Sequence, residues 1–547
     1  MGAIGIPPPV TFPLALRGGS ASSDRMDSRP DHPSAVTEVA TASHQLSAGF
    51  CWSLVLLLLL GVALRLGHIE HDFYHMDEKI AQAVVKNLSF PQQWDTNWAK
   101  TDLSPESGFH YDQFNFSSYH ILLYFWKCLV SALGVDWVNH PGALRALNGL
   151  LGLISIWAVA LAVRQIAGEI AGIAAAGAGA IMPLWVEDAH YLRCESMLTA
   201  GVAILLWLST RRDSTNRWVL FSSCLIVGWM MACKATTGLA APLLLIILIN
   251  AANRPLGRQQ SLLIPLGIAG LGLVVGVVLG VPGGVAQPQL YLSGLARLAV
   301  QYRSPLPPFT RPDMAPSLGV TLEYMKGTLG LGLWAVAVLG VGSMIKLAGW
   351  WRTGLLLSPL AAALLVFGGH AFFAERSYSP FLPIAIVFFG AGIQLLVRTI
   401  MRRFGPKRSY HAAILTAFLL TVTLALPMIY SWQLVFRVFS GQERLEEKKA
   451  IVRMKGDLSG QIVSMDQMAY YPDNYRSISA AVEAKEPVLV IVLDYNEPYS
   501  GSCLITLQNR FNGRILGVRE SIFPNLPPCF LTTFISPKLW LIYIPSK

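Results

Sequence analysis

The feature that most constrains the fold is a series of apolar runs that extends through most of the chain. A helix needs ~20 mostly apolar residues to cross a bilayer. Only 14% of the 547 residues are charged, well below the roughly 25% found in soluble domains. We therefore predict an α-helical polytopic membrane protein with about 11 transmembrane helices, at approximately 49–67, 143–163, 168–184, 194–210, 218–234, 238–252, 261–281, 329–346, 353–370, 380–397 and 411–432.

The Lys and Arg residues between the runs predict the orientation of the chain. With the N-terminus inside, five successive cytosolic loops carry Arg or Lys, which is the positive-inside pattern; these loops are 164–165, 211–217, 253–258, 346–352 and 398–411. This distribution in short clusters also argues against a nucleic-acid partner, despite a net charge of +10. We expect a multi-pass protein of the plasma (inner) membrane with a cytosolic N-terminus and an extracytoplasmic C-terminus.

One apolar run does not fit this orientation. The segment "SYHILLYFWKCLVSALGV", residues 118–135, is long enough to span, but counting it would place the later Arg clusters outside. Its Tyr, Trp and Lys content is typical of an interfacial helix. We predict that it lies at the membrane surface within a first outer loop, residues 68–142.

Composition divides the chain into three parts. Residues 1–47 are rich in Pro, Ser, Ala and Gly and are predicted to be a disordered cytosolic tail. Residues 48–433 form the transmembrane domain. Residues 434–547 are predicted to be a small extracytoplasmic α/β domain, with strands at "QIVSM", "EPVLVIVLDYN", "SCLITLQ", "CFLTTFI" and "LWLIYIP". Cys503 and Cys529 could form a disulfide there, whereas the other cysteines are expected to pack as small apolar residues.

Ionisable residues near the membrane boundaries gather on the predicted outer face. Each has an ordinary alternative explanation, because acids favour the first turn of a helix and lone cations often extend to lipid headgroups. Their joint placement on one face favours function, since such groups are costly near a membrane. The residues are Asp77, Glu78, Glu187, Asp188, Arg193, Glu195, Lys234, Arg376 and Tyr378.

Acids and cations at one membrane face suit sugar transfer from a polyprenyl phosphate. An acceptor hydroxyl needs a base, and a carboxylate can supply it. The departing lipid phosphate gains negative charge, which Arg or Lys stabilises. A single displacement without an enzyme nucleophile would invert the anomeric centre.

Five segments over residues 50–400 also resemble, in order, the motifs of a known enzyme group. They are "MDEKIAQAVV", "HPGALRALNGLLGLISIWAVALAVRQIAG", "AHYLRCESMLTAGVAILLWL", "LIVGWMMACKATTGLAAPLLLI" and "ERSYSPFLPIAIVFFGAGI". The chain resembles GT-C fold glycosyltransferases of family 39, the group of protein O-mannosyltransferases and aminoarabinose transferases. The Lys-Pro pair of aminoarabinose transferases is absent before "YHILLYFW", which argues against that particular activity.

The resemblance implies roles for the outer residues. Asp77 would be the catalytic base, with Glu78 beside it. Glu195 would be the second acidic site, although Glu187 and Asp188 lie close to it in the sequence. Arg193, Lys234, Arg376 and Tyr378 would bind the donor phosphate. Some relatives use a divalent metal cation and others do not; no cofactor is certain, and Asp77 and Glu195 would hold a metal if one is present.

The predicted function is therefore that of an integral-membrane glycosyltransferase. It would move a hexosyl or pentosyl group from a dolichyl or undecaprenyl phosphate to a hydroxyl of a protein, lipid or glycan acceptor, outside the cytoplasm and with inversion. Two alternatives stay open: a polytopic transporter or flippase, and a polysaccharide polymerase or ligase that acts on lipid-linked glycans. A binding-only homologue is a further alternative.

Overall fold

The computed structural model describes residues 46–545 with several gaps. The gaps are 72–77, 79–80, 83, 86–116, 212–215, 253–262, 287, 290–291, 293–295, 297–314, 372–374, 406–408, 466–471, 494–496 and 521–537. The chain separates into two units, residues 1–47 and 48–547. The predicted tail thus falls almost wholly outside the described residues, and the predicted division at residue 433 stays a prediction.

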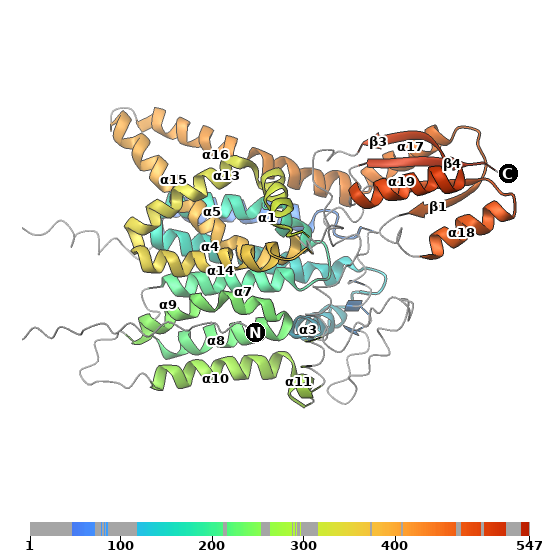
Figure 1. The fold of residues 1–547 in the computed structure, drawn as a ribbon. Coiled ribbons are helices and arrows are strands. Elements are labelled where there is room, and N and C mark those ends of the chain that lie inside the picture. Colours follow the sequence, from blue (N-terminus) through green and yellow to red (C-terminus); the bar gives the residue numbers. More distant parts are fainter. Residues whose placement is uncertain are drawn as a thin grey trace, which may run out of the picture. The chain divides into compact units, whose positions relative to one another are not determined.

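The described part of the second unit is mostly helical (Figure 1). Its helices up to the C-terminal sheet are α1 (Ala48–Leu66), α3 (Ser118–Ala132), α4 (Gly142–Ala167), α5 (Glu169–Ala180), α6 (Pro183–Ala189), α7 (Glu195–Thr210), α8 (Arg217–Cys233), η5 (Ala235–Ala240), α9 (Ala241–Ala252), α10 (Leu263–Gly280), α11 (Pro282–Ala286), α13 (Leu318–Ala348), α14 (Trp350–Gly368), η6 (Glu375–Ser377), η7 (Ser379–Phe381), α15 (Leu382–Phe404), α16 (Ser409–Gln433), the π-helical η9 (Leu434–Phe439) and α17 (Gln442–Lys455).

Among the described residues, seven helices are long and apolar enough to cross a membrane. The pair α5 and α6, bent by 54°, would be an eighth span. Three shorter apolar helices, at 195–210, 217–233 and 235–251, coincide with the remaining predicted segments. The predicted class, a polytopic helical membrane protein with a small C-terminal α/β domain, is confirmed.

The anomalous run at 118–135 forms α3, a helix of 15 residues. The Ser118 hydroxyl donates to the Trp229 carbonyl at 2.7 Å, and the Trp126 indole donates to the Ala143 carbonyl at 2.8 Å. These bonds tie α3 to the end of α8 and the start of α4. Its interfacial position stays a prediction.

The centre of the helical bundle is α15, whose most apolar stretch is 83% buried. Glycines let α13 approach α15 closely: a Cβ on Gly340 would overlap the Phe388 carbonyl oxygen, and one on Gly392 would overlap the Val336 carbonyl oxygen. Small residues at such contacts are typical of packing between membrane helices. This core fixes the segment that enters α15 and carries part of the site.

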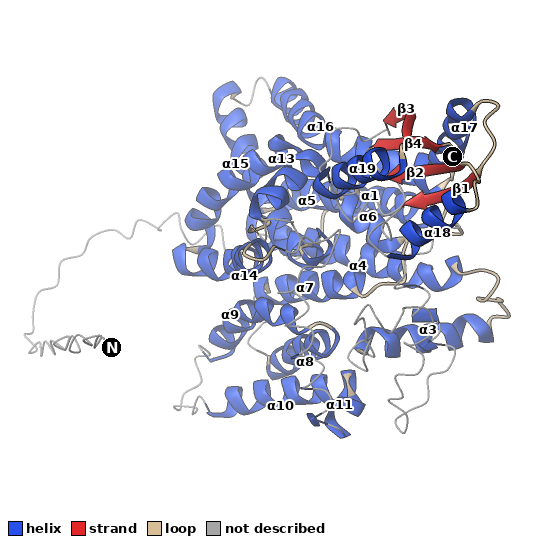
Figure 2. Cartoon of the chain, turned by 45° about the vertical axis from the view of Figure 1, so that its right-hand side comes forward, coloured by secondary structure: helices blue, strands red, loops and turns tan. Residues whose placement is uncertain are grey.

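The C-terminal region contains a four-stranded sheet in the order β1-β2-β4-β3 (Figure 2). Strands β1 and β2 are parallel, and β4 is antiparallel to both β2 and β3. The parallel pair needs a crossover, which α18 supplies. The elements are β1 (Gln461–Met465), α18 (Pro472–Glu483), β2 (Val488–Leu493), α19 (Glu497–Phe511), β3 (Arg514–Glu520) and β4 (Lys538–Ile544).

The strand predicted at "SCLITLQ" is wrong, because this segment lies within α19. Leu507 and Phe511 are four residues apart, so both reach the core beside Val490 and Ile542. Strand β3 was not predicted. The segment "CFLTTFI" and the proposed disulfide partner Cys529 lie outside the described residues.

Candidate functional site

The break between α5 and α6 determines where two of the predicted acids lie. Helix α6 starts at Pro183, a residue that suits the first turn of a helix. At the end of α5, the buried Arg65 guanidinium donates to the carbonyls of Gly179 and Ala180, each at 2.8 Å. A cation on these unsatisfied carbonyls stabilises the helix end. Arg65 thus holds the bend from which α6 continues toward the site.

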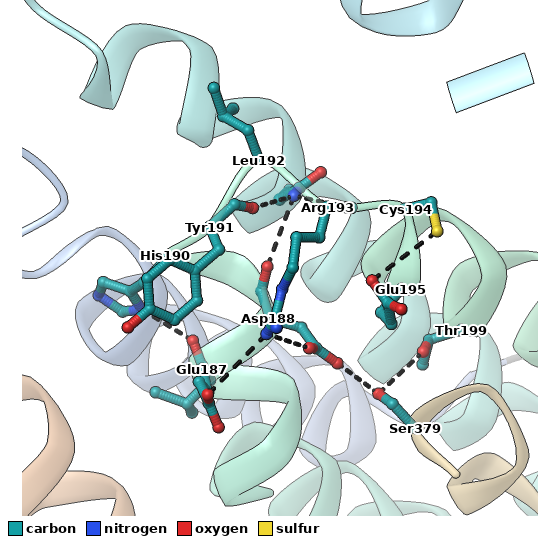
Figure 3. A network of polar contacts seen from close by, with 12 residues as sticks. Glu187, Asp188, His190, Tyr191, Leu192, Arg193, Cys194, Glu195, Thr199 and Ser379 are labelled. Atoms are coloured by element: carbon teal, nitrogen blue, oxygen red, sulfur yellow. Dashed lines mark hydrogen bonds and ion pairs between the residues drawn. The ribbon is translucent and has the colours of Figure 1, made fainter. Parts of the chain in front are cut away.

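Arg193 is the centre of a buried cluster of charges (Figure 3). Its Nη2 lies 3.2 Å from Asp188 Oδ1 and 3.8 Å from Glu187 Oε1. All three side chains are at most 3% exposed, so solvent does not screen their interaction. The Asn148 amide donates to the backbone carbonyls of Tyr191 and Arg193, which fixes the turn that carries the cation.

Asp188 also connects this cluster to the segment before α15. The Ser379 hydroxyl donates to Asp188 Oδ2 at 2.5 Å, and the Thr199 hydroxyl lies 3.3 Å from the same Ser379 oxygen. The Trp185 indole donates to the Ser379 carbonyl at 3.2 Å. Within the described residues, Glu187 Oε2 makes no hydrogen bond. The acids of α6 and the η6–η7 segment therefore form one continuous polar network.

A second ion pair joins α7 to the end of α8. Glu195 is the first residue of α7, where the helix dipole favours a carboxylate. Lys234 follows α8 in an extended conformation, and its Nζ lies 3.5 Å from both Glu195 Oε1 and Ser377 Oγ. The Lys234 side chain is 19% exposed, whereas Glu195 is nearly buried. The Lys234 side chain is thus positioned by Glu195 and is partly exposed.

The remaining predicted cation and the tyrosine lie next to this pair. Arg376 is half-buried and precedes Ser377 in η6. Tyr378 is buried, with its hydroxyl 3.0 Å from Thr321 Oγ1 and its ring edge-on to Phe367. The burial of Tyr378 favours a packing role over contact with a ligand.

Of the predicted acidic pair after the first span, only Glu78 is described, and Asp77 lies outside the described residues. Glu78 is fully buried and accepts two hydrogen bonds from Arg145, at 2.9 and 3.1 Å. Its Oε1 also accepts from the Leu192 amide at 2.9 Å. Because both carboxylate oxygens are engaged, the contacts favour a positioning role for Glu78.

Sequence reasoning missed Arg65, Arg145, Asn148 and Ser379. The first three are single polar residues within or at the end of apolar runs, and a buried polar group must find a partner. That signal could have marked them as structural or functional. Ser379 carries no such signal, because serine is common in membrane helices and loops.

The described residues do not fit a divalent metal. No group of three or more His, Cys, Asp and Glu side chains with suitable placement occurs among them. Glu187, Asp188 and Glu195 are already paired with Arg193 or Lys234, whose charges would oppose a bound cation. We therefore derive no step through a metal, and the proposed ligand Asp77 lies outside the described residues.

Residues 138–279 match the sequence family described as dolichyl-phosphate-mannose-protein mannosyltransferase. The predicted resemblance is confirmed over this segment. It contains three of the five motifs and the residues Arg145, Glu187, Asp188, Arg193, Glu195 and Lys234. The site described above is thus built largely from a segment related to glycosyltransferases.

Two solved structures are similar at low identity. The *Archaeoglobus fulgidus* oligosaccharyltransferase, tethered to an acceptor peptide, is 13% identical over 78% of this chain, with a TM-score of 0.44. This chain spans 59% of the length of that protein. ArnT from *Cupriavidus metallidurans*, bound to undecaprenyl phosphate, is 11% identical over 92% of this chain and 99% of its own, with a TM-score of 0.49. The search of curated proteins found no match.

Proposed function

We propose that this protein is an integral-membrane glycosyltransferase that takes its sugar from a polyprenyl phosphate. The observation that carries the proposal is the Glu195–Lys234 pair, in which a partly exposed lysine lies within a segment similar to the mannosyltransferase family. Arg376 lies in η6, next to Ser377, which Lys234 contacts. The acceptor is a hydroxyl of a protein, lipid or glycan, and the product has the inverted anomeric configuration.

Lys234 is the cation best suited to meet the donor phosphate. A separation of 3.5 Å from Glu195 is long for a charge-assisted hydrogen bond, so a phosphate can compete for the ammonium. Arg376 adds a second positive charge from the neighbouring η6. Arg193 is enclosed by carboxylates and almost fully buried, so it holds Asp188 and Glu187 in place and does not contact the ligand.

Asp77 remains our proposed base. It would take the proton of the acceptor hydroxyl as the oxygen attacks the anomeric carbon. The bond between that carbon and the phosphate oxygen breaks, and the phosphate leaves with the electron pair. Cations at the phosphate stabilise the charge that develops there. Attack opposite to the leaving group inverts the configuration.

The reaction would occur on the extracytoplasmic face of the plasma (inner) membrane. The Arg- and Lys-rich loops support this, because the positive-inside rule assigns them to the cytosolic ends of the helices, and the site residues lie at the other ends. Cysteine labelling of a variant with a single reporter cysteine next to residue 77 tests this orientation, and labelling only from the cytoplasm would contradict it.

The activity is tested by incubating the purified protein in nanodiscs with a panel of polyprenyl-phosphate sugars and acceptors. We expect release of polyprenyl phosphate from one donor. Lys234→Met should lower that release about 100-fold, the usual cost of removing a group that stabilises the leaving charge. The control is Lys346→Met, which changes an exposed lysine in the last turn of α13. This change should leave the release of polyprenyl phosphate unchanged. Asp77→Asn should abolish turnover.

The same panel separates the alternatives. If no donor is consumed while a lipid-linked glycan crosses the bilayer of sealed vesicles, the protein is a transporter or flippase. If the product is a growing glycan chain on the lipid carrier, the protein is a polymerase or ligase. Full activity of Asp77→Asn would assign the base to another residue.

A further inference from the structure

Two cysteines lie at the same end of neighbouring helices beside the site. Helix α7 and helix α8 are consecutive and joined by a short connection, so the start of α7 meets the end of α8. Cys194 directly precedes α7 and Cys233 is the last residue of α8. Sequence reasoning treated both only as small apolar residues, because they lie in or beside apolar runs.

The contacts between the two helices lead directly to this pair. The Trp229 indole donates to the Met197 sulfur at 3.4 Å, one helical turn from Cys233 and from Cys194, respectively. Beyond the cysteines, Lys234 Nζ lies 3.5 Å from Glu195 Oε1. Printed contacts between the two helices therefore lie on both sides of Cys194 and Cys233.

The two cysteines are less buried than the other cysteine of α8. Each cysteine is half-buried, whereas Cys224, earlier in α8, is buried. Ser117 Oγ lies 3.4 Å from Cys233 Sγ, and the Cys194 thiol donates to Glu195 Oε2 at 3.7 Å (Figure 3). Sequence places this end of the helices outside the cytoplasm, where disulfides persist.

We propose that Cys194 and Cys233 are a thiol pair that closes to a disulfide when a small-molecule disulfide oxidant reaches the outer face. One thiolate attacks the oxidant, forms a mixed disulfide and releases one small thiol. The second thiolate then attacks the protein sulfur of that mixed disulfide and releases the other small thiol. The two cysteines lose two electrons, the oxidant gains them, and the protons leave on the two released thiols.

This cross-link would fasten the start of α7 to the end of α8 at the Glu195–Lys234 ion pair. Closing it would restrict the two backbone segments that carry these side chains. The inference concerns covalent modification of the protein and does not depend on the proposed sugar transfer.

The test uses the purified full-length protein in nanodiscs, treated with oxidised glutathione without denaturant and then alkylated. Alkylation is measured residue by residue, because the exposed Cys128 and the predicted pair Cys503 and Cys529 can also react. We expect Cys194 and Cys233 to lose alkylation together and to appear in one linked peptide, with recovery after dithiothreitol. Cys224→Ser should give the same linked peptide, because this cysteine lies outside the pair.

Single variants make the result specific. In Cys194→Ser, the reaction should stop at the mixed disulfide, so that Cys233 carries a glutathione adduct. The proposal is overturned if folded wild-type protein keeps both thiols alkylatable, or if both cysteines carry separate glutathione adducts and no linked peptide is found. Because the wild-type measurement needs no substitution, loss of folding in a variant cannot obscure it.

Discussion

Glu78→Ala should destabilise the protein strongly, because Glu78 is the partner of a buried arginine. The substitution removes two charge-assisted hydrogen bonds to Arg145, each worth about 1.5 kcal/mol, and leaves the Leu192 amide without its acceptor at a cost of about 1 kcal/mol. The total of about 4 kcal/mol lies in the range for breaking a buried pair. Arg145 keeps its bonds to the carbonyls of Ile69 and His71, so the loss should not be larger.

The assay is reversible unfolding by sodium dodecyl sulfate in mixed micelles, followed by circular dichroism. The matched control is Glu169→Ala, which breaks a pair with Arg164 at 3.3 Å whose side chains are 35% and 17% exposed. That change should cost less than about 1 kcal/mol. In a double-mutant cycle, Glu78→Ala and Arg145→Ala should show a coupling of at least about 2 kcal/mol. Equal losses for Glu78→Ala and Glu169→Ala would refute the structural role.

Three further predictions concern packing, protonation and the helix break. Gly340→Ala should destabilise the protein by about 2 kcal/mol through overpacking, since the new methyl group would meet the Phe388 carbonyl; Gly342→Ala, with open space around it, should be neutral or stabilising in the same unfolding assay. Burial lowers the pKa of His190 to about 4, against two carbonyl contacts that act in the opposite direction. The unfolded chain therefore binds more protons between pH 4 and about 6.5, so the free energy of unfolding should fall as the pH falls through this window. His190→Gln should show a weaker decline, and identical pH profiles would contradict this assignment. Arg65→Met removes the two hydrogen bonds that cap the end of α5 and leaves an apolar side chain in their place. We expect the rate of donor turnover to fall even under conditions in which the variant stays folded in the unfolding assay. An unchanged turnover rate would show that the position of α6 does not depend on this cap.

The sequence alone predicted the helical class and most element positions. An apolar run of sufficient length has no stable alternative to a helix in a bilayer, because each backbone polar group must be satisfied within the segment. The same reasoning failed at "SCLITLQ", where short apolar runs fit either a strand or a helix. There, packing of Leu507 and Phe511 against β2 and β4 selected the helix.

Part of the site was also visible in the sequence. The motifs around Arg193, Glu195 and Lys234 are apparent in the sequence, because charges beside apolar runs are unusual. The sequence did not reveal which cation meets solvent. Burial of Arg193 between two carboxylates and partial exposure of Lys234 distinguish them.

Apolar run length, a local property of the chain, determined that this protein crosses a membrane many times; loop charge, also local, predicts that its acids and cations gather near one boundary. Tertiary structure alone decided the partners: Glu78 with Arg145, and Asp188 with Arg193 and Ser379. These pairs join residues on different helices or loops, and their geometry depends on how the bundle packs around α15. No periodicity along the sequence encodes that packing.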